Sequence, residues 1–292
     1  MPEGPEVKVR AEKLNQLLAG VRLVTIEALG VYLTKAKYQH LRARISGLQN
    51  VLRSKKVTID WVKSKGKLIY MQLGLDHDQK HQVKYLASHL GMTGDWKYAP
   101  DKHACIRIDY QIAGGDISMS HLYFDDSREL GTFAIMSVAD TKEMLARLGP
   151  DVLDKNFTEK KWLQVIDKKR NSKRALAVLL ADQHFISGIG NYLRCDILYE
   201  AGFDPQKQAC DMDEADWEIL YEAIHKVIQK SYEAGGTVLQ MYKSYDRSTD
   251  ICPPGTYQPK VYGREYDIEG RVVKTIVIQK RTLYWVPEVQ KN

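Results

Sequence analysis

Apolar residues first recur at helical spacing between residues 5 and 19. The positions are Val7, Ala11, Leu14, Leu17 and Leu18. This spacing puts them on one face of an α-helix. The proline at residue 5 suits a first helical turn, and the glycine at residue 20 is a typical C-terminal stop. We therefore expect an amphipathic helix at the start of the chain.

From Val21 to about Ser137 the pattern changes to short runs of β-branched and aromatic residues, which Gly, Asp and Lys clusters separate. The runs are VRLVTIEAL, KLIYMQLGL, VKYLASHL, CIRIDYQI and HLYFDD. Runs of this length, bounded by turn residues, are typical of antiparallel strands. The pattern predicts an antiparallel β-sandwich or barrel.

Helical periodicity returns from about Asp140 and continues through the stretches TKEMLARL, TEKKWLQVIDKK, SKRALAVLLADQ, GIGNYLRCDILYEAG and DEADWEILYEAIHKVIQKSYEAGG. Thr158 is placed to cap the second of these helices. The segment LGPDVLD, residues 148–154, has the composition of a linker. Beyond Gly255 the alternation of a strand resumes around a Glu269-Gly270 turn, which predicts a terminal β-hairpin.

Together these patterns predict an α+β protein of two domains. We expect an N-terminal β-sandwich domain with a leading helix at 2–139, a linker at 140–155, a helical domain at 156–255 and the hairpin at 256–292. The chain has 292 residues and is 44% apolar, which is enough for a sizeable core and excludes a disordered or fibrous protein.

Several classes of protein are disfavoured by what the chain lacks. It has no run of about 18 apolar residues, as a membrane span needs, and no apolar stretch near the N-terminus, as a signal peptide needs. We therefore expect an intracellular protein that is not associated with a membrane. Its cysteines follow no CxxC or regular spacing, and we expect them to be reduced and structural. They are Cys105, Cys195, Cys210 and Cys252.

The positive charge is clustered. Net charge is +6 with a pI near 8.9. Residues 53–67 hold six basic residues and one acidic residue, and residues 168–174 hold five basic residues in seven. Such clusters suit a phosphate backbone, while a solvated basic face or a nuclear-import signal remains the alternative.

The opening MPEGPEVK offers a nucleophile. Removal of Met1 would leave Pro2 with a free secondary amine, whose ordinary pKa near 8 leaves far more neutral amine than that of lysine, about 10.4. Such an amine forms an iminium with a carbonyl carbon and keeps its positive charge without a proton. Glu3 and Glu6 are near enough in sequence to move protons there. The alternative is a polar helix entry.

Three other stretches place unusual side chains on presumed turns. Lys67 begins a strand directly after a glycine, Met92 lies on a loop flanked by glycines, and Arg128 and Leu130 lie on a further turn. Apolar and arginine wedges enter a base stack and fill the hole left by an extruded nucleotide. Side chains folded back onto their own domain are the alternative for each.

With these stretches the chain resembles the formamidopyrimidine-DNA glycosylase and endonuclease VIII family of bifunctional base-excision repair enzymes. The likeness covers almost the whole chain and rests on motifs in family order: PEGPEV, SKGK, HLGMTG, LGPDVL, SGIGNYLRCDILYEAGFDP, GGT and VYGRE. The resemblance implies that Pro2 is the nucleophile, Glu3 the acid that assists ring opening and Glu6 a supporting carboxylate. It also implies that Lys67 contacts the phosphate beside the lesion.

The same resemblance assigns DNA contacts. SGIGN resembles the helix-two-turn-helix of the family, in which Gly188 and Gly190 let helix ends approach DNA and Asn191 binds a phosphate. Met92, Arg128 and Leu130 would occupy the void after base flipping. Family members often have phenylalanine where this chain has Leu130, so we expect weaker stacking on the opposite strand.

The C-terminal element departs from most of the family, which has a four-cysteine zinc finger there. Residues 261–285 contain no cysteine, so the resemblance implies a zincless finger and no metal site in this element. Apolar residues would replace the ion, and Arg281 falls where the family's finger arginine is expected. The candidates for this packing are Val272, Ile276, Ile278, Leu283 and Trp285.

The resemblance therefore implies a DNA glycosylase with an associated lyase that ends in β,δ-elimination and needs no cofactor. Its partner would be damaged double-stranded DNA, possibly also single-stranded DNA, bound by a monomer. The glycine of PEGPE resembles the endonuclease VIII branch, which favours oxidised pyrimidines. The segment 243–255 is expected to cover the lesion pocket. A non-catalytic nucleic-acid-binding protein with the same helix-two-turn-helix is the competing hypothesis.

Overall fold

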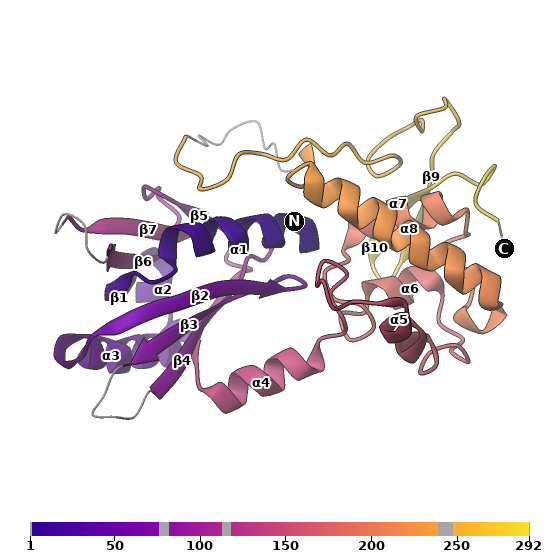
Figure 1. Ribbon diagram of the computed structural model, residues 1–292. Coiled ribbons are helices and arrows are strands. Elements are labelled where there is room, and N and C mark those ends of the chain that lie inside the picture. Colours follow the sequence, from indigo (N-terminus) through magenta and orange to yellow (C-terminus); the bar gives the residue numbers. More distant parts are fainter. Residues whose placement is uncertain (1, 76–81, 113–117, 239–247, 292) are drawn as a thin grey trace. The chain divides into compact units, whose positions relative to one another are not determined.

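The computed structural model describes residues 2–75, 82–112, 118–238 and 248–291 (Figure 1). Its strands are β1 Arg22–Ala28, β2 Val57–Lys65, β3 Leu68–Leu75, β4 Gln82–His89, β5 Asp95–Lys97, β6 Ala104–Gln111, β7 Ser120–Asp125, β8 Thr132–Met136, β9 Lys274–Ile278 and β10 Arg281–Trp285. Its α-helices are α1 Gly4–Leu18, α2 Gly30–Thr34, α3 Gln39–Ser54, α4 Val138–Arg147, α5 Glu159–Ile166, α6 Leu176–Ala181, α7 Asn191–Ala201 and α8 Glu214–Glu233. Two short 3₁₀ turns, Ala36–Tyr38 and Ala209–Asp211, complete the set.

The chain forms two compact units. Unit 1 comprises Pro2 and the described residues within 7–146 and 248–253, whereas unit 2 comprises residues 3–6 and the described residues within 147–238 and 254–291. This division departs from the predicted domain boundaries in two places, because residues 3–6 join unit 2 and residues 248–253 join unit 1. Helix α4 also occupies the first half of the predicted linker.

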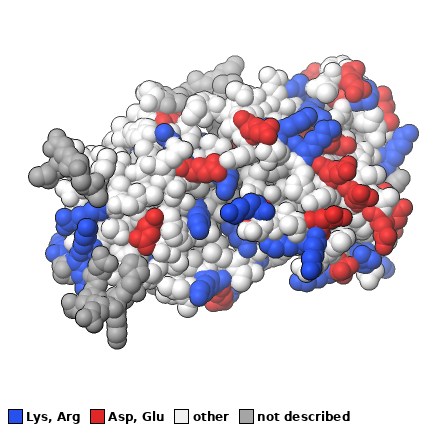
Figure 2. All heavy atoms as spheres, in the orientation of Figure 1, with Lys and Arg blue, Asp and Glu red and all other residues white. Residues whose placement is uncertain are grey.

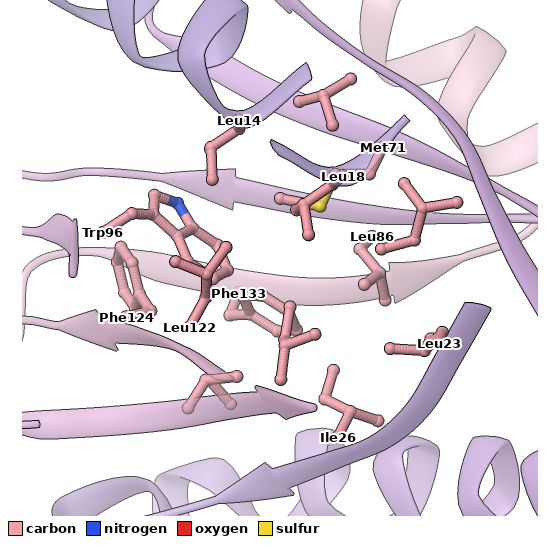
Figure 3. Packing of buried hydrophobic residues seen from close by; sticks show 14 of the residues in the cluster. Leu14, Leu18, Leu23, Ile26, Met71, Leu86, Trp96, Leu122, Phe124 and Phe133 are labelled. Atoms are coloured by element: carbon pink, nitrogen blue, oxygen red, sulfur yellow. The ribbon is translucent and has the colours of Figure 1, made fainter. Parts of the chain in front are cut away.

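Unit 1 is built on one antiparallel sheet with the strand order β5-β7-β6-β1-β2-β3-β4-β8. The central strands β1 and β2 share only two residue pairs, so the sheet divides into two halves at this point. Trp96 and Phe124 from one half pack against Phe133 from the other, with ring centroids 6.3 and 6.5 Å from that of Phe133 (Figure 3). The two halves therefore enclose a common core, which confirms the predicted β-sandwich.

Helix α1 buries the stripe that its sequence predicted. Val7, Leu14 and Leu18 are fully inaccessible to solvent and belong to the unit 1 core (Figure 3). The chain leaves the helix through Gly20, whose φ of +80° favours glycine. The stripe thus attaches the N-terminal helix to the sandwich.

One part of the predicted β region is wrong, because residues 30–54 form α2, a 3₁₀ turn and α3. The buried residues of α3 are Leu41, Ile45, Leu48 and Leu52, which recur at helical rather than strand spacing. The β-branched runs on either side of this segment concealed that period.

Unit 2 has its own core, formed by α5 to α8 and the terminal hairpin. Trp162 packs between Phe185 and Trp217, with centroid distances of 5.9 Å to each. Asp213 caps α8 by accepting a hydrogen bond of 2.8 Å from the Asp216 N–H, whereas Thr158 makes no side-chain cap on α5. Acidic and basic side chains are mixed on the face of the molecule where α8 lies (Figure 2).

The terminal hairpin turns at Gln279 and Lys280 rather than at the predicted Glu269-Gly270. Strands β9 and β10 pair from Ile278↔Arg281 onward, and the two turn residues have φ of +50° and +60°, as a type I′ turn requires. At Glu269-Gly270 a turn does form, but it is flanked by a single bridge between Tyr266 and Val272.

Packing of the hairpin agrees with the sequence at three of the five expected apolar positions. Leu283 is fully buried, and Ile276 and Ile278 pack partly buried against the unit 2 core. Val272 is 50% exposed, so its predicted packing role is wrong. Trp285 keeps part of its surface accessible to solvent and is not among the residues of that core. Across the described ranges, none of the helices has the length and apolar character to cross a bilayer.

Candidate active site

The Glu3 carboxylate is held by the start of helix α7. It accepts hydrogen bonds from the backbone N–H groups of Gly190 at 2.6 Å, Tyr192 at 3.1 Å and Leu193 at 3.3 Å. Helix N-termini favour anions because their first N–H groups lack partners in the helix. The side chain is 2% exposed, so its orientation is set by these donors. They hold the carboxylate at the start of α7.

Glu6, in the first turn of α1, is also held by hydrogen bonds. Its Oε1 accepts hydrogen bonds from the Thr237 N–H at 2.7 Å and the Tyr192 hydroxyl at 2.8 Å. Its Oε2 accepts a bond of 2.8 Å from the Glu3 N–H, which belongs to the peptide bond that joins Pro2 to Glu3. Glu6 therefore fixes the peptide group directly attached to the predicted nucleophile, and Pro2 itself is buried.

Glycines make these contacts possible. A Cβ atom at Gly190 would lie 2.2 Å from Glu3 Cδ, and one at Gly236 would lie 2.5 Å from Glu6 Cγ. The carbonyl of Gly188 accepts a bond of 2.8 Å from the Gly4 N–H, and a Cβ at Gly4 would approach Gly188 Cα to 3.2 Å. The glycines of PEGPE, SGIGN and GGT thus allow close packing around the two carboxylates.

The amide groups of SGIGN are used within unit 2. The Gly188 N–H donates to Gln183 Oε1 at 2.9 Å, and the Gly190 N–H donates to Glu3 as described. A phosphate contact through either glycine, expected from the sequence, stays a prediction. The structure shows instead that these amides orient the loop and the Glu3 carboxylate.

Asn191 and Arg281 lie close together. The Asn191 side chain donates a hydrogen bond of 2.8 Å to the carbonyl of Thr282, the residue next to Arg281 in β10. Arg194 holds the other end of the amide, with Nε and Nη2 at 3.0 and 2.5 Å from Asn191 Oδ1. Arg281 is exposed. The helix-two-turn-helix and the hairpin therefore present one polar edge, on which a phosphate contact remains a prediction.

Unit 1 gathers the predicted wedges on two adjoining loops. Asp126 joins the loops by accepting hydrogen bonds from the Thr93 hydroxyl at 2.9 Å and the Gly131 N–H at 2.5 Å. A Cβ at Gly91 would lie 2.5 Å from the Gly131 nitrogen, so the loops are in direct contact. These bonds position Met92 on one loop and the exposed Arg128 and Leu130 on the other.

Lys67 lies near the same loops. It follows Gly66, which has φ of +57°, at the turn between β2 and β3. Burial lowers the pKa of His89, and the ammonium group of Lys67 lowers it further. His89 Nδ1 accepts a hydrogen bond of 3.0 Å from the Gly91 N–H, so this histidine shapes the Met92 loop.

The predicted residues thus fall into two groups, one in each unit. Glu3, Glu6, Asn191 and Arg281 belong to unit 2, and the wedges and Lys67 belong to unit 1. Of the segment 243–255 that was expected to cover the lesion pocket, residues 243–247 lie outside the described residues. Within the described ranges, no group of three His, Cys, Asp or Glu side chains is placed to hold a metal ion.

Three contributing residues were not found from the sequence. Tyr192, Arg194 and Thr237 contact Glu6 or Asn191, yet none carries chemistry that a pattern of residue types would single out. The available signal was proximity to motifs, because Tyr192 and Arg194 lie within three residues after the SGIGN stretch and Thr237 ends GGT.

Comparisons with known proteins identify the family of this chain. The model of the formamidopyrimidine-DNA glycosylase N-terminal domain matches residues 1–133, and the model of the H2TH domain of the same enzyme matches residues 148–243. Endonuclease 8 of Pectobacterium carotovorum is 25% identical and that of Salmonella typhimurium strain LT2 is 27% identical, each over the full length of both chains.

Solved structures share the fold. A complex between Lactococcus lactis Fpg and DNA containing an abasic site superposes with a TM-score of 0.76 at 24% identity, covering 99% of each chain. A variant of that protein, R247G, in complex with DNA containing THF gives 0.77 at 23% identity with the same coverage. With family models matching most of its length and a two-unit α+β fold, this chain belongs to the formamidopyrimidine-DNA glycosylase and endonuclease VIII family of DNA glycosylases.

Proposed function

We propose that this protein is a bifunctional DNA glycosylase and abasic-site lyase of base-excision repair, with the Pro2 amine as its nucleophile. The observation that carries the proposal is the pair of buried carboxylates beside that residue. Glu3 directly follows Pro2 in the chain. The Glu6 carboxylate accepts a hydrogen bond of 2.8 Å from the Glu3 N–H, which belongs to the peptide bond between Pro2 and Glu3. A terminal amine whose neighbouring peptide group is fixed in this way is suited to attack at one defined point.

The chemistry follows from the amine once Met1 is removed. The Glu3 carboxylate takes a proton from the protonated Pro2 amine, the neutral amine attacks C1′ of the flipped nucleotide, and the bond from C1′ to the damaged base breaks. The departing base takes up the N–H proton that remains on the attacking nitrogen. Glu3 then returns the proton to the ring oxygen as the sugar opens and a C1′ iminium forms. Loss of a C2′ proton expels the 3′ phosphate, and a second elimination expels the 5′ phosphate.

The proposed substrate is an oxidised pyrimidine in duplex DNA. Two features support it: the full-length relatives are named Endonuclease 8, and Gly4 stands where the other branch of the family tends to have leucine. Lys67, Asn191 and Arg281 are proposed to bind phosphates. Met92, Arg128 and Leu130 are proposed to fill the vacated space in the duplex, on the two loops that Asp126 joins.

Trapping the intermediate tests this function. Borohydride reduces an iminium to a stable amine, so the protein should become covalently attached to duplexes that carry oxidised pyrimidines, and Pro2→Thr should lose the adduct. Peptide mapping should place the DNA on residue 2 of a chain that lacks Met1. Attachment at Lys67, or trapping that survives in Pro2→Thr, would contradict the assignment.

A panel of defined lesions then tests the substrate class. Oxidised pyrimidines should be excised faster than 8-oxoguanine in otherwise identical duplexes. Tight duplex binding without any adduct or strand cleavage would instead favour the competing hypothesis of a non-catalytic binding protein with a helix-two-turn-helix.

A further inference from the structure

We propose that Tyr192 is a positioning residue of this active site, acting through Glu6 on the peptide bond next to Pro2. The inference rests on the proposed function, because it assigns a role within that reaction. It concerns a residue with no reactive group toward DNA, buried in unit 2 at 3% exposure.

Tyr192 contacts both carboxylates from one position in α7. Its backbone N–H donates to Glu3 Oε1 at 3.1 Å, and its hydroxyl donates to Glu6 Oε1 at 2.8 Å. The helix start therefore fixes Glu3 through the main chain and Glu6 through a side chain. Gly190, Tyr192 and Leu193 donate backbone N–H groups to Glu3 in the described part of the chain. Of these three residues, Tyr192 is the one whose side chain also donates to Glu6.

The direction of the hydrogen bonds is determined. A tyrosine hydroxyl has one proton, and Tyr192 donates it to Glu6 Oε1. The Ser231 hydroxyl, 2.9 Å from the Tyr192 oxygen, must then donate to it. Burial raises the pKa of Tyr192 well above its ordinary value, and the charges of Glu6 and Glu3 raise it further. Tyr192 therefore stays protonated and remains a donor.

The contacts continue to the nucleophile. Glu6 Oε2, at the far side of the same carboxylate, accepts the Glu3 N–H at 2.8 Å. The Tyr192 ring is itself packed against Tyr257, with centroids 6.0 Å apart, so the donor is attached to a rigid support. Without the hydroxyl, Oε1 loses one of its donors while the bond from the Thr237 N–H stays, so the carboxylate gains freedom to rotate away from the Pro2–Glu3 peptide group.

Single-turnover trapping with Tyr192→Phe tests the role. The substrate is a duplex with a preformed abasic site, at saturating protein, and binding is measured separately with a reduced abasic analogue. We expect the rate of adduct formation to fall about tenfold or more, since hydrogen bonds to charged groups are among the stronger ones, while the Kd stays within about twofold. Tyr221→Phe is the matched control, because that ring packs on Phe157 at the edge of the unit 2 core, with ring centroids 6.2 Å apart.

A double-mutant cycle separates positioning from a general structural effect. If Tyr192 acts through Glu6, Tyr192→Phe should cause no further loss of rate in a Glu6→Ala background. Independent losses that multiply would overturn the proposal. Ser231→Ala removes the donor to the Tyr192 oxygen and should slow trapping about two- to fivefold. If Tyr192→Phe does not fold, this second variant tests the positioning role of Tyr192.

The outcomes distinguish this inference from the function on which it rests. An unchanged trapping rate in both Tyr192→Phe and Ser231→Ala would overturn the positioning role and leave the Pro2 mechanism intact. Failure of the wild-type protein to form any adduct would overturn both.

Discussion

Glu3 Oε2 accepts a hydrogen bond of 2.6 Å from the Gly190 N–H, and a Cβ atom at residue 190 would lie only 2.2 Å from Glu3 Cδ. Gly190 has φ of −123°, a value open to any residue, so its backbone conformation does not require glycine. The requirement comes from the carboxylate, which occupies the space that any other side chain would need.

Gly190→Ala should therefore impair the chemistry more than the fold. The methyl group would push the Glu3 carboxylate away from the start of α7, and we expect about a tenfold or greater loss of single-turnover excision, with overpacking costing about 1–3 kcal/mol of stability. Gly47→Ala in α3 is the control, since no atom lies within 4 Å of its added Cβ. It should keep full activity and gain about 0.5–1 kcal/mol. Normal excision by Gly190→Ala would show that the position of Glu3 is not critical.

Arg281→Ala should weaken productive binding without affecting the amine. This exposed side chain lies beside Thr282, whose carbonyl binds Asn191 at 2.8 Å. We expect the variant to lose most activity on a base lesion, to keep much more on a preformed abasic site, and to reduce the salt slope of duplex binding by about 0.9. Lys274→Ala, at the other end of the hairpin, should change these values less. An unchanged salt slope together with normal excision would leave Arg281 without a role at DNA.

Metal removal should leave the protein intact. The terminal hairpin contains no cysteine, and Leu283 at its centre is fully buried against the unit 2 core, so apolar packing accounts for its attachment. Excision rates and the melting temperature should be the same before and after dialysis against EDTA. Elemental analysis that found stoichiometric zinc, or EDTA that abolished cleavage, would contradict this account of the hairpin.

The stability of unit 1 should depend on the ionisation of Asp109. Burial alone would raise the pKa of this carboxyl, but hydrogen bonds from Arg107, His121 and Thr25 lower it to about 2. Because the folded pKa lies below the ordinary value of 3.8, the stabilisation is complete above that value and is lost as pH falls toward 2. The shift corresponds to about 2 kcal/mol.

Asp109→Asn should accordingly lower the free energy of unfolding by about 2 kcal/mol at pH 7, with the difference from wild type shrinking between about pH 4 and pH 2. Urea unfolding across this range measures it. Asp167→Asn is the control, because its ion pair with Arg170 is exposed and should contribute little at any pH. If the difference in the free energy of unfolding between wild type and Asp109→Asn stayed unchanged below pH 2, the proposed ionisation of Asp109 would be contradicted.

The sequence by itself determined the local elements and the identity of the chemical groups. The stripe of α1, the strands around Ile69 and Ile106, and the long helix α8 follow from spacing, because a regular element exposes one face to its core. The motifs also marked Pro2, Glu3 and Glu6. In residues 30–54 the local pattern misled, since helix α3 lies between two strands rich in β-branched residues.

Only the tertiary structure decided which of these groups meet. Tyr192 and Glu6 are 186 residues apart in the chain, yet the Tyr192 hydroxyl lies 2.8 Å from Glu6 Oε1. Neither the periodicity nor the composition of the sequence predicts this contact. The same holds for residues 248–253, which leave the helical region of the sequence to place Ile251 and Cys252 in the unit 1 core. The spacing of apolar residues predicts which face of a single helix or strand is buried. Contacts between distant residues depend instead on how the elements pack together and on which buried polar groups become hydrogen-bond partners in the core.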